Sequence, residues 1–167
     1  TDHGNLFGTI SFVKNAEKPG IKPIIGCEGY MVTDHKNDEK PGRENHKSYH
    51  IGMLARTYEG YQNLSKGVSD AHVDGFYYRP RTDLETLAEF SKGLIAFTGC
   101  MQGWIPQLIL RGEEEEAEKA MGQMIDIFGK ENYFVELHNH GIEEQIKLIP
   151  ELLKLAKKFD LKTIASN

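Results

Sequence analysis

The stretch Pro23-Ile24-Ile25-Gly26-Cys27-Glu28 decides the fold, because it is a short apolar run that ends abruptly in polar residues. Two further runs, Leu94–Phe97 and Thr163–Ala165, are also apolar and show no strict alternation of polar and apolar side chains. Strands that are covered on both faces have this composition, which is typical of parallel sheets. The three runs therefore predict buried strands of an α/β protein.

Segments with helical patterns alternate with these strands along the chain. The predicted strands are Ile21–Val32, Ser48–Ala55, Gly93–Thr98, Tyr133–Leu137 and Leu161–Ser166. The predicted helices are Leu6–Lys18, Thr57–His72, Asp83–Phe90, Trp104–Leu110, Glu113–Phe128 and Ile142–Phe159, the last with a break or kink at Pro150. This alternation indicates an α/β fold with a mostly parallel sheet. An incomplete TIM-like barrel and an open sheet both fit the pattern.

The composition is that of a single soluble globular domain, residues 1–167, with 39% hydrophobic residues. The net charge of −5 argues against autonomous, sequence-independent binding of nucleic acid, although not against contact with a strand that a larger protein delivers. No apolar run is long enough to span a membrane, and no signal peptide opens the chain. Two cysteines give no disulfide framework, so a cytoplasmic location is expected.

The longest predicted loop, Thr33–Lys47, contains almost no apolar residues and is rich in Asp, Asn, Pro and Gly. Such a composition is typical of a solvated insertion at the surface. We therefore expect this loop to be flexible.

Four side chains at or near the predicted strands are able to bind metal ions: His3, Glu28, His50 and Cys100. Imidazole, carboxylate and thiolate groups are common metal ligands, and the ends of parallel strands meet at one rim, where active sites lie. Each residue also has a simpler explanation. His3 suits a turn and Glu28 a solvent-facing strand end, whereas a lone His50 or Cys100 is often part of a core.

Asp2 and Cys27 flank two of these candidates. An adjacent carboxylate can orient a ligand imidazole, so Asp2 is a candidate partner of His3. In an alternating strand Cys27 and Glu28 point to opposite faces, and Cys27 is therefore expected to pack in the core.

The fourth predicted strand ends in His138-Asn139-His140-Gly141. If the strand continues, His138 and His140 share one face, which suits a metal ion. A polar loop explains the same residues equally simply.

A compact aromatic and basic cluster comprises Phe76, Tyr77, Tyr78, Arg79 and Arg81. Such side chains can stack on bases or contact phosphates. Packing and anchoring of a loop is the alternative explanation.

Five segments of the chain together resemble a known family. They are Thr1-Asp2-His3-Gly4-Asn5, Pro23–Glu28, Glu59–Leu64, Gly93–Ala96 with Gly99-Cys100, and Ile164–Asn167. In this order and spacing they are similar to the polymerase-and-histidinol-phosphatase (PHP) domain at the N-terminus of bacterial DNA polymerase III alpha subunits, over essentially the whole chain. The resemblance implies a distorted TIM-like (β/α)7 barrel with up to three metal ions, Zn or Mn, at the rim of the strands.

Matched motif by motif, the resemblance implies that His3, Glu28, His50 and Cys100 are metal ligands, with Glu28 placed to bridge two ions. It places four further residues beside the site, namely Asp2, His138, His140 and Asn167. His138 departs from the family pattern, because relatives usually carry glutamine at that position.

Two blocks of the family pattern lie outside the chain, a His-x-His pair before Thr1 and an Asp-x-His pair after Asn167. The chain is therefore expected to be a fragment, truncated at both ends and incomplete as a barrel. With only part of the ligand set, it is expected to act structurally, and neither to polymerise nucleotides nor to degrade DNA on its own.

For the parent protein the resemblance implies DNA replication by a DNA-directed DNA polymerase, a nucleotidyltransferase. The metal-binding domain would be phosphoesterase-like and a possible 3′–5′ proofreading exonuclease. Implied partners are the rest of the alpha subunit, a separate proofreading exonuclease subunit, and DNA bound by the parent, with no membrane. The alternative is a free-standing PHP-type phosphatase similar to histidinol phosphatase. The Glu59–Leu64 segment and Cys100 favour the polymerase branch.

Overall fold

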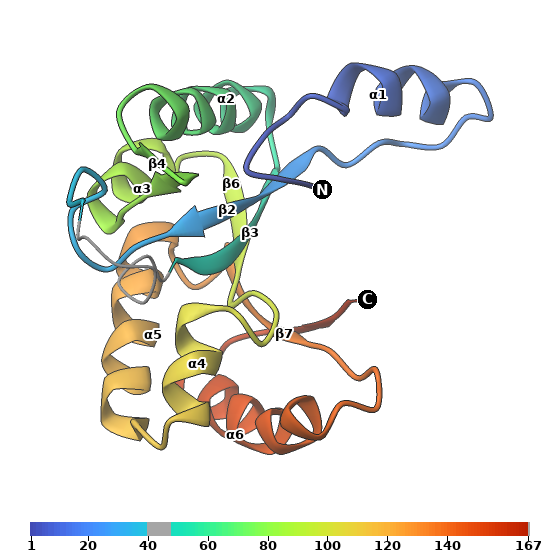
Figure 1. Ribbon diagram of the computed structural model, residues 1–167. Coiled ribbons are helices and arrows are strands. Elements are labelled where there is room, and N and C mark those ends of the chain that lie inside the picture. Colours follow the sequence, from blue (N-terminus) through green and yellow to red (C-terminus); the bar gives the residue numbers. More distant parts are fainter. Residues whose placement is uncertain (40–47, 167) are drawn as a thin grey trace.

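The computed structural model describes residues 1–39 and 48–166, which form a mixed α/β unit (Figure 1). Its strands are β1 (Asp2–His3), β2 (Gly26–Met31), β3 (Tyr49–Ala55), β4 (Phe76–Tyr77), β5 (Arg79–Thr82), β6 (Leu94–Phe97), β7 (Tyr133–Leu137) and β8 (Thr163–Ala165). Its helices are α1 (Thr9–Glu17), α2 (Tyr58–Val73), α3 (Leu84–Phe90), α4 (Trp104–Leu110), α5 (Glu114–Phe128) and α6 (Glu143–Phe159). The predicted α/β class is confirmed.

The strands form one sheet in the order β4-β5-β2-β3-β6-β7-β8, and β1 also pairs with β2. The pairs β1–β2, β2–β5, β6–β7 and β7–β8 are parallel, whereas β3 runs antiparallel to both β2 and β6. The sheet is therefore mixed rather than mostly parallel. No helix lies in the described part of the β2–β3 connection, and adjacent strands joined without a helical crossover pair antiparallel. Within the described residues the paired strands run from β4 to β8 as an open path, and closure into a barrel stays a prediction.

Alternation along the central strands separates a core face of the sheet from an open face. Cys27 and Met31 of β2 and Ile51 and Met53 of β3 are buried and belong to the main hydrophobic cluster. Helices α2, α4, α5 and α6 contact these strands and β6 and β7. The intervening residues of β2, including Glu28, are only partly buried. One strand thus contributes to the core with one set of side chains and to the open face with the other.

Two predicted helix starts are confirmed by capping hydrogen bonds. The Thr57 hydroxyl accepts a bond from the Gly60 backbone N–H at 3.0 Å, and the Asp83 carboxylate accepts one from Thr86 at 2.9 Å. Such caps satisfy N–H groups that have no partner inside the helix. Of the expected break or kink at Pro150, the break is wrong, because α6 continues through this residue to Phe159. A kink stays a prediction.

Helix α1 is shorter than predicted and extends away from the other helices (Figure 1). It begins at Thr9 rather than Leu6, and none of its residues is buried. Its apolar side chains remain accessible, among them Ile10 and Phe12, which are 61% and 51% exposed. No helix in the described ranges is long and apolar enough to cross a bilayer.

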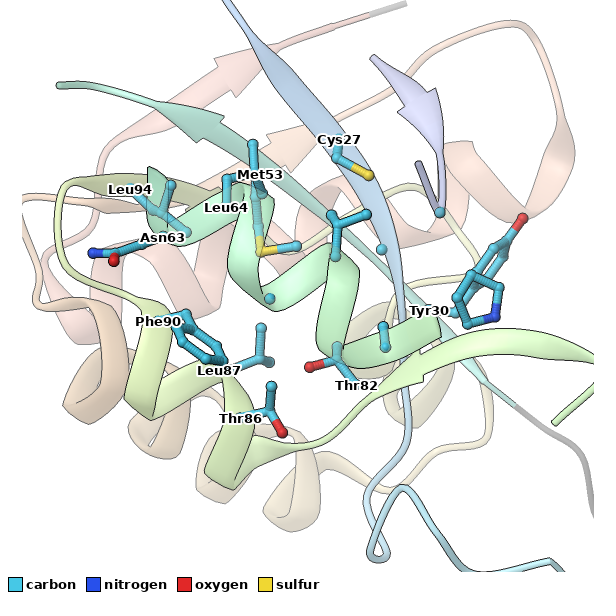
Figure 2. A pocket seen from close by; sticks show the side chains of 16 residues that line it. Cys27, Tyr30, Met53, Asn63, Leu64, Thr82, Thr86, Leu87, Phe90 and Leu94 are labelled. Atoms are coloured by element: carbon cyan, nitrogen blue, oxygen red, sulfur yellow. The ribbon is translucent and has the colours of Figure 1, made fainter. Parts of the chain in front are cut away.

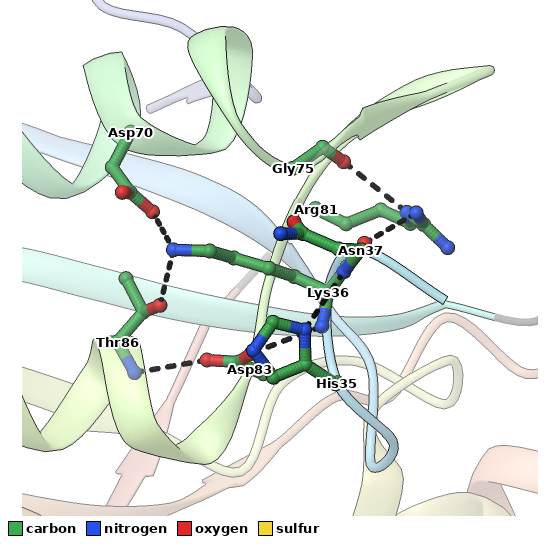
Figure 3. A network of polar contacts seen from close by, with 8 residues as sticks. All are labelled: His35, Lys36, Asn37, Asp70, Gly75, Arg81, Asp83 and Thr86. Atoms are coloured by element: carbon green, nitrogen blue, oxygen red, sulfur yellow. Dashed lines mark hydrogen bonds and ion pairs between the residues drawn. The ribbon is translucent and has the colours of Figure 1, made fainter. Parts of the chain in front are cut away.

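The long loop after β2 is tied to the domain at Lys36 (Figure 3). The Lys36 ammonium contacts the Asp70 carboxylate and donates to the Thr86 hydroxyl at 2.8 Å, while its backbone N–H donates to Asp83 at 3.0 Å. Only 13% of the Lys36 side chain is exposed, and a charge removed from water requires such partners. Residues 40–47 of the predicted flexible loop lie outside the described residues, and its flexibility stays a prediction.

An apolar cavity lies between the core face of β2 and helices α2 and α3 (Figure 2). Its lining includes Cys27, Met53, Leu64 and Phe90. Cys27 and Glu28 point to opposite faces of β2, as predicted. Most of the lining therefore belongs to the core, and of the residues of β2 only Tyr30 comes from the face that carries Glu28.

Replacing Asp83 with alanine should lower the free energy of unfolding by about 1–2 kcal/mol, because two backbone N–H groups lose their acceptor. Burial alone would raise the pKa of the Asp83 carboxyl, but hydrogen bonds from the Thr86 and Lys36 N–H groups hold that pKa below its usual value. The stabilisation by ionised Asp83 is therefore fully present above the pKa of an ordinary Asp carboxyl. It is lost as the pH falls through the lowered pKa of Asp83 in the folded chain.

Urea denaturation of wild type and Asp83→Ala at neutral and acidic pH measures this difference, which should shrink at acidic pH. Asp126→Ala, an exposed substitution on α5, is the matched control. Equal stability of Asp83→Ala and the control at neutral pH would contradict the prediction.

Candidate metal centre

Strand register brings three of the predicted ligands to the open face of the sheet. His3 on β1 pairs directly with Glu28 on β2, and His50 on β3 pairs with Tyr30, two residues further along β2. Paired residues share a face, and so do residues two apart on one strand. His3, Glu28 and His50 therefore lie side by side on three neighbouring strands.

Glu28 lies between the two histidines. One carboxylate oxygen, Oε2, is 3.2 Å from His3 Nε2, and the other, Oε1, is 2.5 Å from His50 Nδ1. One ligand atom from each of the three residues lies within 4.8 Å of the other two. Two imidazoles and a carboxylate at such separations are able to hold a metal ion.

His50 reaches this site from the start of its strand and not from the end. From the sequence we expect all ligands at the C-terminal ends of parallel strands. His50 differs, because it is the second residue of β3. Because β3 is antiparallel to β2 and β6, its first residues lie beside the last residues of its neighbours.

Cys100 joins the site through the loop that follows β6. Its Sγ is 3.6 Å from His50 Nδ1. The preceding Gly99 has a φ of +81°, and a Cβ at this position would lie 2.6 Å from the His50 carbonyl oxygen. Only glycine allows the loop to approach β3 this closely, and this approach brings the thiol to the imidazole.

The site carries a charge network centred on Glu28 and His50. Hydrogen bonds with Cys100 and then Glu28 outweigh burial and raise the pKa of His50 to about 9. The hydrogen bond with His50 outweighs burial and lowers the pKa of Glu28. Protonated His50 and ionised Glu28 are thus mutually stabilised at neutral pH, and a metal ion would displace the proton from His50 on binding.

Asp2 lies away from the ligand group. It pairs with Cys27, so it points to the opposite face of β1 from His3. Its carboxylate accepts a hydrogen bond from the Gly8 N–H at 2.9 Å. This contact fixes the turn that follows His3, in line with the simpler explanation of that segment.

A second polar cluster lies at the end of β7. His138 Nε2 is buried and 3.2 Å from Glu136 Oε1, which accepts a 2.6 Å hydrogen bond from the Ser166 hydroxyl. The His140 ring lies 5.6 Å from the His138 ring, and its Nδ1 is 3.0 Å from Gln145. Glu136 and Ser166 were not among the predicted site residues, although Glu136 precedes His138 with the same two-residue spacing as that between His138 and His140.

The cluster at β7 adjoins the loop of Cys100, because Cys100, Glu136 and His138 line one small cavity. No regular hydrogen bond reaches His138 Nε2 from the described part of the chain. Asn167 lies outside the described residues.

The sequence matches a known family and several known proteins. The family profile described as PHP domain matches residues 1–140. DNA polymerase III subunit alpha of Thermus aquaticus is 43% identical, and those of Borreliella burgdorferi and Treponema pallidum are 42% and 39% identical. Each alignment covers the whole chain, but the chain spans only about 14% of the length of these relatives.

The two thiols should differ in reactivity. Cys27 is fully buried, and burial raises its pKa to about 11 against opposing hydrogen bonds from backbone groups of Asn5 and Gly4. Alkylation requires the thiolate, so iodoacetamide at mildly alkaline pH should modify partly exposed Cys100 first. Peptide mass spectrometry over time measures both sites.

The folded Cys100→Ser variant should react hardly at all with iodoacetamide. The same variant in denaturant is the control, because its remaining thiol, Cys27, should then react. Modification of Cys27 at the same rate as Cys100 in the folded chain would contradict this assignment.

Proposed function

The chain belongs to the PHP-domain family, and from this premise we propose that it is the PHP domain of a DNA polymerase III alpha subunit and binds catalytic metal through His3, Glu28, His50 and Cys100. The observation that supports this proposal is the group of His3, Glu28 and His50 atoms within 4.8 Å of one another. The matched alpha subunits are similar to the chain over its full length.

The donor set fits a transition metal. Imidazole nitrogens suit Zn and Mn, the thiol of Cys100 suits Zn, and the carboxylate of Glu28 suits Mn. Glu28 directs one oxygen to each histidine, so it is placed to bridge two ions. His138, with its buried nitrogen close to Glu136, is available beside the Cys100 loop for a further contact.

Bound metal would polarise a phosphate ester and lower the pKa of a bound water to near neutrality, and up to three ions are proposed for the complete domain. The residues of the chain would hold this centre on a rigid sheet. The sheet shields Glu28 from one side, and His50 and His3 fix both carboxylate oxygens. We propose that the sheet belongs to a distorted (β/α)7 barrel in the complete domain.

The proposed reaction is removal of a 3′-terminal nucleotide from DNA, a 3′–5′ proofreading exonuclease activity within the whole alpha subunit. Polymerisation would belong to the remainder of that subunit, which is the first proposed partner. Replication would place the protein in the bacterial cytoplasm.

A second candidate function is a structural module that stabilises the polymerase and docks a separate proofreading subunit. One observation favours it: Glu28 contacts His3 at 3.2 Å and His50 at 2.5 Å, so these polar contacts also tie three strands together. Metal binding and hydrolysis distinguish the two functions.

Glu28→Gln should weaken zinc binding by about 100-fold or more, because it removes the charge between the histidines while conserving the volume of the side chain. Titration calorimetry and elemental analysis of the dialysed protein measure the effect. Glu113→Gln, which alters an exposed pair with Arg111, is the matched control and should bind zinc normally. Unchanged zinc content in Glu28→Gln would exclude Glu28 as a ligand.

In the full-length alpha subunit, His50→Ala should abolish metal-dependent release of a 3′-labelled nucleotide from a single-stranded primer and leave primer extension intact. The reason is that His50 contacts both Glu28 and Cys100, so its loss disrupts the whole ligand set. Addition of a chelator should reproduce the defect in the wild-type protein. If the wild-type protein releases no label with Zn or Mn, the structural candidate is supported instead.

A further inference from the structure

Three large aromatic side chains are exposed close to the candidate metal centre. Phe7, Phe76 and Tyr78 are 85%, 55% and 71% exposed. The exposed His72 ring connects two of them, with ring centroids 6.4 Å from Phe7 and 6.2 Å from Phe76. Together with the exposed Arg79 these residues are termed the aromatic ridge.

The β4–β5 hairpin divides its side chains between the ridge and the body of the domain. The Arg81 guanidinium lies 5.1 Å from the centre of the Tyr77 ring, and Arg81 is only 6% exposed because it hydrogen-bonds the Gly75 carbonyl and the loop after β2. Phe76 and Tyr78 flank Tyr77 in the sequence and remain accessible, although the Tyr78 ring also contacts the Tyr77 ring edge to face, with centroids 4.8 Å apart. Within the predicted aromatic and basic cluster, Arg81 therefore anchors the loop, Phe76, Tyr78 and Arg79 are exposed, and Tyr77 contacts both Arg81 and Tyr78.

Tyr78 occupies the turn of the hairpin in a left-handed conformation with a φ of 58°. A bulky side chain is disfavoured there, whereas glycine or asparagine adopts this conformation readily. The hairpin thus keeps an exposed aromatic ring at a position where a smaller residue would relieve the backbone. Strain of this kind is concentrated at functional sites.

The ridge is continuous with the candidate metal centre. The Arg79 guanidinium lies 4.7 Å from the centre of the Tyr30 ring, and that ring is 5.5 Å from the His50 ring. His72 Nε2 is 2.7 Å from the carbonyl oxygen of Gly4, the residue that follows the first ligand. Two separate lines of contacts therefore connect the exposed rings to the ligand group.

We propose that the aromatic ridge is a stacking surface for single-stranded DNA whose 3′ end reaches the metal centre. The inference rests on the proposed function and specifies the form of its substrate. Unpaired bases stack on aromatic rings, and Arg79 is placed to contact a phosphate. The net charge of −5 gives little long-range attraction for DNA. Stacking therefore supplies most of the affinity, and binding depends only weakly on salt.

Fluorescence anisotropy of a labelled oligodeoxythymidylate with the 167-residue chain at low salt tests the ridge. Phe76→Ala and Tyr78→Asn should each weaken binding at least about fivefold, because each removes a stacking ring. Asparagine relieves the left-handed turn, so misfolding does not explain its effect. Tyr78→Phe keeps the ring and should bind as wild type.

The matched control is Tyr58→Ala, since Tyr58 is 75% exposed at the opposite end of α2 from His72, roughly 20 Å away. It should bind DNA normally. Arg79→Gln should reduce the slope of log affinity against log salt by about 0.7, the value for one phosphate contact on a single strand. A blunt duplex, whose bases are already stacked, should bind more weakly than the single strand.

Three results would each overturn the proposed role of the ridge. They are undetectable binding of the oligonucleotide, wild-type affinity of Tyr78→Asn, and a loss of affinity in Tyr58→Ala equal to that in the ridge variants. Zinc uptake by the same samples separates this inference from the proposed function. A chain that binds DNA through the ridge but takes up no zinc supports the ridge and refutes the metal centre. A chain that takes up zinc but shows no ridge-dependent binding refutes the ridge alone.

Discussion

The candidate site depends on the pairing of β2 with a neighbour along each of its edges. β1 brings His3 level with Glu28, and β3 brings His50 opposite Tyr30. Because side chains alternate, the same strand sends Cys27 into the core. A slip of one residue would exchange the two sets, burying a carboxylate and exposing the core. Core packing therefore fixes the register, and the register fixes the distances between the ligand atoms.

Strands β2, β3, β6, β7 and β8, two helix starts and the opposite orientation of Cys27 and Glu28 follow from local patterns, so the sequence alone could predict them. The short strands β1, β4 and β5 were not predicted. The direction of β3 could not be predicted in this way, because an apolar strand pattern is the same in either direction. The available signal was the predicted loop Thr33–Lys47, whose sequence shows no helical pattern. The antiparallel direction of β3 has a consequence for the site. His50 lies at the beginning of β3, whereas Cys100 follows the end of β6, and the two side chains meet because these strands run in opposite directions.

Contacts between distant segments were the features that local sequence did not reveal. Lys36 belongs to a stretch that is polar and otherwise exposed, and its partner Asp70 lies on another element 34 residues later. Glu136 and Ser166 likewise meet only because β7 and β8 pair. The anchoring of the loop after β2 and the position of Tyr78 at a one-residue turn likewise depend on the assembled sheet. The metal-binding roles of the predicted ligands stay predictions, although the sheet places these residues together.

The cavity behind β2 gives the domain a mechanical property that its polar face does not have. Gly29 and Gly67 line this cavity and contribute no side chain to fill it. Hydrostatic pressure favours states in which internal voids are eliminated, so pressure is expected to act on the interface between β2 and α2. Because the opposite face of β2 carries Glu28, compression there acts on the geometry of the ligand group. The packing on one side of β2 and the position of the Glu28 carboxylate on the other side are thus mechanically linked through a single strand.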